Sequence, residues 1–133
     1  MANNFLLKIV TPSRDVYNGM VQRVLLRNSD GEFEVLANHG DMITSTVPNI
    51  AKFVDENGET FEVFISTAIV NVIKDEVIIC SDAVEFADDI DLERAEKAKK
   101  RAEEKILSPD LYDKERVKLS LLRATERIRL KNK

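Results

Sequence analysis

The sequence has little of what several common kinds of site require. Among its 133 residues it has one cysteine, one histidine, four glycines, three prolines and no tryptophan. A lone cysteine excludes an internal disulfide, and one cysteine with one histidine cannot ligate a zinc ion. Cys80 lies in the apolar run 77–80, so we interpret it as a small buried hydrophobic residue. This composition fits a reducing cytoplasm.

Enzyme signatures are also missing. The chain has no glycine-rich loop of the G-x-x-x-x-G-K-[ST] type and no recognisable Ser/His/Asp arrangement. Its carboxylates are scattered over predicted turns and exposed strand faces, which is typical of a solvated surface. We therefore expect no catalytic residue, no metal site and no required cofactor.

Long hydrophobic runs are absent as well. No apolar stretch approaches the roughly 18 residues that span a bilayer. The first four residues, Met1 to Asn4, contain no basic segment leading into an apolar stretch, so we predict no secretory signal. The chain is not expected to insert into a membrane by itself.

What the chain does contain is charge, distributed unevenly. Residues 1–90 hold 6 lysines and arginines against 15 acids, a net charge of −9, and residues 91–133 hold 14 against 9, a net charge of +5. Such a reversal at one point indicates two units with different surroundings. It also allows the basic part to lie against the acidic part.

The acidic part has the pattern of β-strands. Apolar and polar residues alternate, as in Glu32-Phe33-Glu34-Val35, and turn signals such as Asn57-Gly58 separate the runs. Many short strands at this spacing favour an antiparallel sandwich or barrel over residues 1–87. The clearest apolar runs are 5–10, 21–26, 33–36, 61–65, 69–73 and 77–80.

The basic part, residues 88–133, has the pattern of two helices. Acidic residues gather at 88–91, where a helix start favours negative charge. Helix formers follow, and Ser108-Pro109-Asp110 is a break. We predict an antiparallel hairpin with helices at about 90–107 and 112–131. Its facing stripes are Ala95, Ala98 and Ala102 on the first helix, and Val117, Leu121, Ala124 and Ile128 on the second.

Two arginine pairs are placed to share helix faces. Arg94 and Arg101 are seven residues apart on the first helix, and Arg123 and Arg127 are four apart on the second. Folding of the hairpin would bring the pairs near one another. Arginine suits phosphate because its planar donors bind two oxygens at once. Spacing alone nevertheless favours ordinary solvated helix faces.

The single histidine, His39, lies in a predicted loop, Ala37 to Asp41. One interpretation is a loop residue that hydrogen-bonds its neighbours. The other is a contact with a partner protein, because loops on rigid sheets often bind. The residues alone leave both interpretations open.

Four motifs in order resemble the epsilon subunits of F-type ATP synthases. They are Ile9-Val10-Thr11-Pro12 with the segment 16–21, the stretch from Gly31 to Gly40, the segment Asp89 to Ala95, which matches an I/L-D-x-x-R-A motif, and Arg123-Ala124-x-x-Arg127. The resemblance covers nearly the whole chain. It departs from the family at Ala37 and Gly40, where prolines are usual, and at Thr67-Ala68, where Gly-Gly is usual.

The resemblance implies an α+β chain with a ten-stranded antiparallel β-sandwich followed by the helical hairpin. It implies a non-catalytic rotor subunit that contacts the gamma subunit and the c-ring. Such a subunit would be a peripheral protein on the cytoplasmic side of the cell membrane. Glu32 and His39 would face that ring. By the same resemblance, the subunit would couple ion flow through the ring to ATP synthesis, and an extended hairpin would reach the alpha/beta head and restrain ATP hydrolysis.

The resemblance also implies ATP as a regulatory ligand of the folded hairpin. The residues that carry over from the family are Glu85, Ile90, Asp91, Arg94, Ala95, Arg101, Arg123, Ala124 and Arg127.

Two other functions are compatible with the composition. A nucleic-acid-binding adaptor would use the +5 hairpin, although nine acids interrupt its basic residues and no aromatic platform accompanies them. A small β-barrel enzyme with a helical tail would need an active-site constellation, which the sequence lacks.

Overall fold

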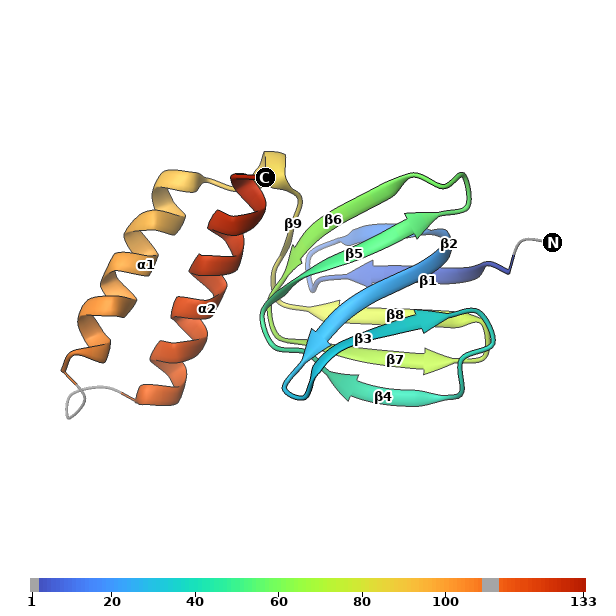
Figure 1. The fold of residues 1–133 in the computed structure, drawn as a ribbon, viewed down its shortest axis with the longest axis horizontal. Helices are drawn as coiled ribbons and strands as arrows, with labels where there is room; N and C mark the ends of the chain where they lie inside the picture. Colours follow the sequence, from blue (N-terminus) through green and yellow to red (C-terminus); the bar gives the residue numbers. More distant parts are fainter. Residues whose placement is uncertain (1–2, 109–112) are drawn as a thin grey trace.

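The computed structural model describes residues 3–108 and 113–133. A β-sandwich comes first in the chain and two helices follow it, side by side at one end of the sandwich (Figure 1). The nine strands in the described residues are β1 (Phe5–Val10), β2 (Asp15–Asn28), β3 (Gly31–Leu36), β4 (Met42–Ser45), β5 (Asn49–Asp55), β6 (Thr60–Ile65), β7 (Ala68–Ile73), β8 (Glu76–Ser81) and β9 (Val84–Glu85).

The long strand β2 connects the two halves of the sandwich. The strands pair in the order β4-β7-β8-β1-β2-β5-β6-β9, and β3 also pairs with β2. The first half of β2 pairs with β1, as at Tyr17 and Ile9. Its second half pairs with β3 and β5, so that Val24 lies between Val35 and Phe53. One 14-residue strand therefore takes part in both layers.

The predicted sandwich followed by a helical hairpin is confirmed, with two differences in its details. The described residues contain nine strands where ten were expected. β1 and β8 pair in parallel, with Leu7 beside Val77, although an antiparallel sheet was predicted. Only neighbouring strands joined by a tight hairpin must be antiparallel, and these two are far apart in the chain. The strands β4, β5 and β9 were not among the predicted apolar runs.

Alternating side chains fill the core of the sandwich. Along β1, Phe5, Leu7 and Ile9 are buried, while the residues between them are half-buried. The same alternation corrects the interpretation of Cys80, which is exposed. Val77 and Ile79 of β8 point inward, so Cys80 points outward. The sequence did not reveal the direction of Cys80, because the outward-facing positions of the run 77–80 are also apolar.

The helices are α1 (Leu92–Ile106) and α2 (Lys114–Lys131), preceded by a short 3-10 turn at Ala87–Asp89. α1 begins two residues later than expected because Asp91 is its N-cap and its side chain accepts a hydrogen bond from the N–H of Arg94, at 3.0 Å. Asp113 caps α2 in the same way. Tyr112, where the second helix was predicted to start, and the break at Pro109-Asp110 lie outside the described residues.

Small residues line the contact between the helices. Ala95 and Ala102 of α1 and Val117 and Ala124 of α2 are buried, in agreement with the predicted stripes. α2 lies between α1 and the sandwich and contacts β5 and β6 (Figure 1). No helix in residues 3–108 or 113–133 is both long and apolar enough to cross a membrane.

Candidate functional site

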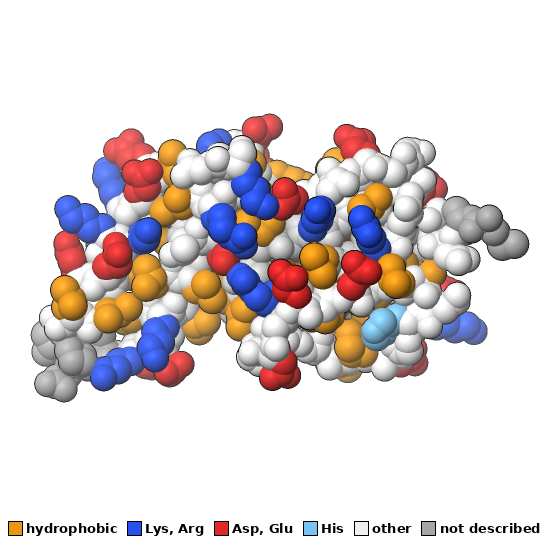
Figure 2. All heavy atoms as spheres, in the orientation of Figure 1, with side chains coloured by type: hydrophobic (Ala, Val, Ile, Leu, Met, Phe, Trp, Pro, Cys, Tyr) orange, Lys and Arg blue, Asp and Glu red, His pale blue; other side chains and the backbone are white. Residues whose placement is uncertain are grey.

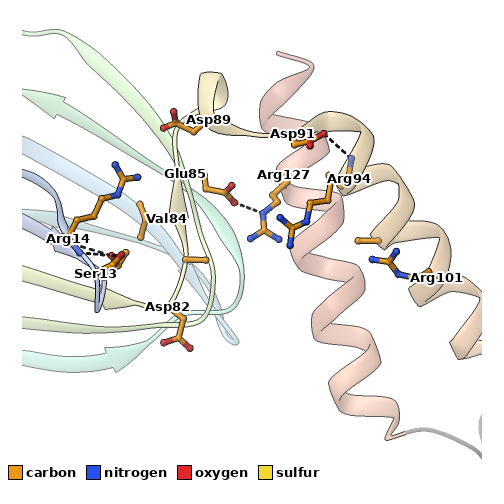
Figure 3. A pocket seen from close by; sticks show the side chains of 14 residues that line it. Ser13, Arg14, Asp82, Val84, Glu85, Asp89, Asp91, Arg94, Arg101 and Arg127 are labelled. Atoms are coloured by element: carbon orange, nitrogen blue, oxygen red, sulfur yellow. Dashed lines mark hydrogen bonds and ion pairs between the residues drawn. The ribbon is translucent and has the colours of Figure 1, made fainter.

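A cleft of about 530 Å³ lies where the sandwich meets the helices (Figure 3). We call it the junction cleft. The turn between β1 and β2 forms one wall, the segment from β8 to the start of α1 forms the floor, and the helices close the other side. The lining residues used below are Arg14, Asp82, Glu85, Asp89, Asp91, Arg94, Ala95, Ala98, Arg101 and Arg127.

Six of the nine residues that the resemblance implied line this cleft together: Glu85, Asp91, Arg94, Ala95, Arg101 and Arg127. The other three do not. Ile90 is 4% exposed and packs against Phe64, and Ala124 is buried between the helices. Arg123 lines a neighbouring cleft. The structure therefore divides the predicted set into lining residues, packing residues and one arginine nearby.

Arg127 is held in place by two contacts with the sandwich. Its Nε donates a hydrogen bond to Glu85 Oε1 at 2.5 Å, within an ion pair. Its guanidinium carbon lies 4.4 Å from the centre of the Phe64 ring, a cation–π contact. Arg127 is thus the side chain of α2 that connects the helix to the floor of the junction cleft.

Arg94 and Arg101 project from α1 into the same cleft (Figure 3). Both are exposed, and neither side chain has an ion-pair partner among the residues that the structure describes. Unpaired guanidinium groups on one wall attract an anion, and phosphate matches their paired donors. Asp91 is different, since its carboxylate already caps α1.

The acids of the junction cleft come mainly from its floor. Asp82, Glu85 and Asp89 belong to the segment that leads out of the sandwich, and two of the arginines come from α1 (Figure 3). The sandwich side of the cleft therefore carries three acids and Arg14, whereas Arg94 and Arg101 face it from α1. The sequence did not single out Arg14 or Asp82, and no motif signals them, because only the fold brings the β1–β2 turn to this point. Asp89 belongs to the segment that matches the I/L-D-x-x-R-A motif, but it was not among the predicted site residues.

A second cleft, of about 540 Å³, lies between the two helices. We call it the interhelix cleft; it shares Ala98 and Arg101 with the junction cleft. Arg123 lines it and donates a hydrogen bond to Ser120 Oγ at 3.1 Å. Burial, and then the nearby charges of Arg127 and Arg116, lower the pKa of the Arg123 guanidinium from its ordinary value. These three arginines all lie on α2, and Arg101 of α1 lines the interhelix cleft together with Arg123.

Basic side chains are more numerous over the helices than over the sandwich, where acidic ones are prominent (Figure 2). This matches the reversal of net charge near residue 90. The basic part does lie against the acidic part, and several ion pairs join them, among them Arg127 to Glu85 and Lys133 to Glu62.

The two residues expected to face a partner ring are separate. Glu32 is exposed near the start of β3, and His39 follows the end of that strand. His39 Nδ1 donates a hydrogen bond to the carbonyl oxygen of Gly40 at 2.6 Å. This is the local contact of the first interpretation of His39, and it does not test the second. The structure does not bring Glu32 and His39 into one cluster.

An apolar surface is exposed on the outer face of β4 and β7. Ile43, Ile69 and Ile73 are 73%, 60% and 53% exposed. The two strands are paired, with Ser45 opposite Ile69, and Cys80 of β8 lies on the other side of Ile69. We call this the β4–β7 face. Contiguous exposed apolar surface of this kind marks interaction sites.

Two family models together match residues 4–132. Residues 4–87 match the ATP synthase, Delta/Epsilon chain, beta-sandwich domain, and residues 88–132 match the long alpha-helix domain of the same chain. The chain belongs to the ATP synthase delta/epsilon family. This confirms the resemblance seen in the four motifs.

Individual proteins of ATP synthases are also similar to this chain in sequence or in fold. The ATP synthase epsilon chain of Clostridium botulinum (strain Alaska E43 / Type E3) is 53% identical over 131 residues, which cover 98% of each chain. That of Clostridium novyi (strain NT) is 41% identical over 98% of this chain and 99% of its own. A chain in the Euglena gracilis mitochondrial ATP synthase has the same fold, with a TM-score of 0.82, 23% identity, and coverage of 93% and 79%.

Family membership supports the predicted function, that of a non-catalytic epsilon subunit of an F-type ATP synthase. It gives no support to the nucleic-acid adaptor or to the small enzyme. The structure adds the junction cleft, the interhelix cleft and the β4–β7 face to this assignment.

Proposed function

We propose that this chain is a rotor subunit that contacts the gamma subunit and the c-ring on the cytoplasmic side of the membrane, and that it binds ATP in the junction cleft. The support for the rotor role is the 53% identity to an ATP synthase epsilon chain, together with the fold of a chain whose structure includes F1 and the c-ring. The support for ATP is the convergence of Arg94, Arg101 and Arg127 on one cleft.

The β4–β7 face is the proposed contact with the gamma subunit. Three isoleucines that are more than half exposed would lose their contact with water there, at about 25 cal/mol per Å² of apolar area. The two ends of β3, with Glu32 and His39, are the proposed contacts with the c-ring. Since these residues are polar and that face is apolar, we assign the two partners to different surfaces, which adjoin one another where His39 lies beside Val72 of β7.

Recovery of partners from detergent-solubilised membranes tests this division. Ile69→Asp should abolish recovery of gamma with the tagged chain, because a carboxylate in an apolar contact is costly to bury. Leu119→Asp, which adds the same charge on α2, is the matched control and should leave recovery unchanged. Equal recovery of gamma with both variants would contradict the proposed gamma contact.

The junction cleft suits a nucleoside triphosphate in size and in charge. Its volume of about 530 Å³ lies within the usual range for small-ligand sites, about 300–1,000 Å³. The triphosphate would lie against the arginines, which bind phosphate oxygens in pairs. The ribose hydroxyls and the base amino group would donate to the carboxylates of Glu85 and Asp89 on the other side.

ATP in this position would stabilise the docked hairpin. It would contact the sandwich through Glu85 and the helices through Arg94 and Arg101, so it would bind the docked form more tightly than an extended one. A ligand shifts such an equilibrium only through this difference in affinity. An extended hairpin would instead reach the alpha/beta head and restrain ATP hydrolysis there.

Calorimetry of ATP binding to the full chain and three variants tests the ligand. Arg127→Ala should weaken binding about tenfold or more, because a charge-assisted pair of hydrogen bonds is lost. Arg123→Ala should weaken it less, since Arg123 lines the interhelix cleft. Arg23→Ala, an exposed arginine of β2 outside both clefts, is the control. Equal heats for all four proteins, or none, would reject ATP binding and leave the rotor proposal intact.

A further inference from the structure

A buried carboxylate lies in the contact between α2 and the sandwich. Glu126 is only 5% exposed, the most deeply buried charged residue of α2. Its Oε1 accepts a hydrogen bond from Arg27 Nη2 at 2.7 Å, and its Oε2 accepts two from Arg129, at 3.0 and 2.6 Å. Arg27 belongs to β2, 99 residues earlier in the chain, whereas Arg129 is on the same helix as Glu126. The Arg27–Glu126 pair therefore joins the two parts.

Burial makes this pair sensitive to its geometry. Removing a carboxylate from water is costly, and only well-formed hydrogen bonds to an opposite charge offset the cost. Here both carboxylate oxygens are paired with guanidinium groups. Loss of one partner would leave a buried charge poorly compensated, whereas exposed pairs such as Lys133 with Glu62 contribute little.

Arg27 also has a choice of partners. Glu32 lies directly opposite it on β3, where cross-strand side chains are neighbours. Arg27 nevertheless donates to Glu126 of α2. Arg27 therefore forms its ion pair with the helix and not with the neighbouring strand of its own sheet. Around the pair, Leu130 packs on Phe64 and Ile90, which gives the contact an apolar base.

We propose that Arg27 and Glu126 form a charge latch that keeps α2 docked on the sandwich without any bound ligand. Separation of the hairpin from the sandwich would break this pair and, in the same step, expose the apolar cluster around Leu130. Because Arg127 follows Glu126 in the helix, the latch also positions Arg127 at the floor of the junction cleft. Only the use of this Arg127 position by a nucleotide rests on the proposed binding of ATP.

Thiol labelling in the absence of nucleotide tests the latch. In the full chain with Cys80→Ser, Leu130→Cys places the single thiol under the docked face, where a reagent reaches it only after α2 separates. Leu130→Cys weakens the contact equally in every protein compared. Arg27→Gln and Glu126→Gln should each raise the labelling rate about tenfold or more, since each leaves a charge of the buried pair without its partner.

Two further variants separate the latch from general effects on α2. Arg129→Gln removes a partner that lies on the same helix as Glu126 and stays beside it whether or not α2 is docked, so it should change the rate less than threefold, at about the size expected for an i,i+3 pair. The double variant Arg27→Gln with Glu126→Gln should label more slowly than the product of the single effects predicts, because the two residues are coupled.

Unchanged labelling in both single variants would overturn the proposal, and so would an effect of Arg129→Gln as large as that of Arg27→Gln.

Circular dichroism of the strands tests whether the sandwich of each variant remains folded. If Arg27→Gln unfolds it, Arg27→Lys retains the charge and should give a labelling rate between those of the parent and Glu126→Gln. A rate as high as that of Glu126→Gln, although the charge is retained, would then overturn the latch. Because ATP is absent, none of these outcomes depends on the nucleotide proposal.

Discussion

The sandwich and the hairpin are stabilised in different ways. The sandwich buries large apolar side chains such as Phe5, Leu7, Ile9 and Phe53. The hairpin buries mainly alanine methyl groups, with Val117 as its bulkiest residue between the helices. Since apolar stabilisation follows buried area, the sandwich has a core of its own and the hairpin depends on what it contacts.

The hairpin contacts the sandwich through ion pairs as well as through the small apolar cluster around Leu130. Arg127 pairs with Glu85, Glu126 with Arg27, and Lys131 Nζ donates to the carbonyl oxygen of Ala87 at 2.9 Å. Ligands and partners compete for charges far more readily than for a closed apolar core. From this comparison we expect the position of the hairpin to be easier to change than the fold of the sandwich.

The largest expected effect is on the core of the sandwich. Leu7→Ala should lower the free energy of unfolding by about 2–5 kcal/mol, because Leu7 is fully buried and its removal leaves a cavity. Urea unfolding followed by the strand signal in circular dichroism measures this. Ile69→Ala, at a position 60% exposed, is the control and should change the free energy by less than about 0.5 kcal/mol. Similar losses for both would show that the core is not the main source of stability.

A smaller effect is expected where the hairpin meets the sandwich. Leu130→Ala should weaken docking by about 1.5–3 kcal/mol, the value of burying a leucine side chain. Trypsin should then cleave the helices faster, while the urea midpoint of the strand signal remains unchanged. A shift of that midpoint as large as the one caused by Leu7→Ala would mean that the two parts unfold together.

The smallest effect concerns the two helix caps. Asp91→Ala and Asp113→Ala should each reduce helical stability by about 1 kcal/mol, measured by thermal loss of the helical signal. Asp91→Asn retains the cap and should not. If Asp91 also contacts ATP, Asp91→Asn weakens binding although the helix is intact. Unchanged ATP affinity in Asp91→Asn would limit Asp91 to its capping role.

Local patterns account for much of the fold. The short apolar runs 5–10 and 69–73 predicted β1 and β7, and the acids at 88–91 predicted a helix start that Asp91 indeed caps. Side chains and backbone within a few residues decide such features. The alanine and valine stripes also predicted which faces of the helices meet, because helical spacing is fixed.

Other features depend on residues far apart in the chain. The parallel pairing of β1 and β8 and the outward direction of Cys80 follow from the register of the sheet. Arg14 reaches the junction cleft because the β1–β2 turn lies beside the segment around Glu85. Arg123 was predicted with Arg127 from their spacing of four, yet they line different clefts, since the sandwich covers only part of α2.

The sequence by itself determined the two-part organisation, the charge reversal near residue 90 and, through its motifs, the family. Only the tertiary structure decided which charges meet. It paired Arg27 with Glu126 rather than with Glu32, and Arg127 with Glu85. The physical reason is the distance along the chain over which residues interact. Strand and helix patterns arise from neighbouring residues, whereas ion pairs between the sandwich and α2 depend on how these two folded parts pack against each other.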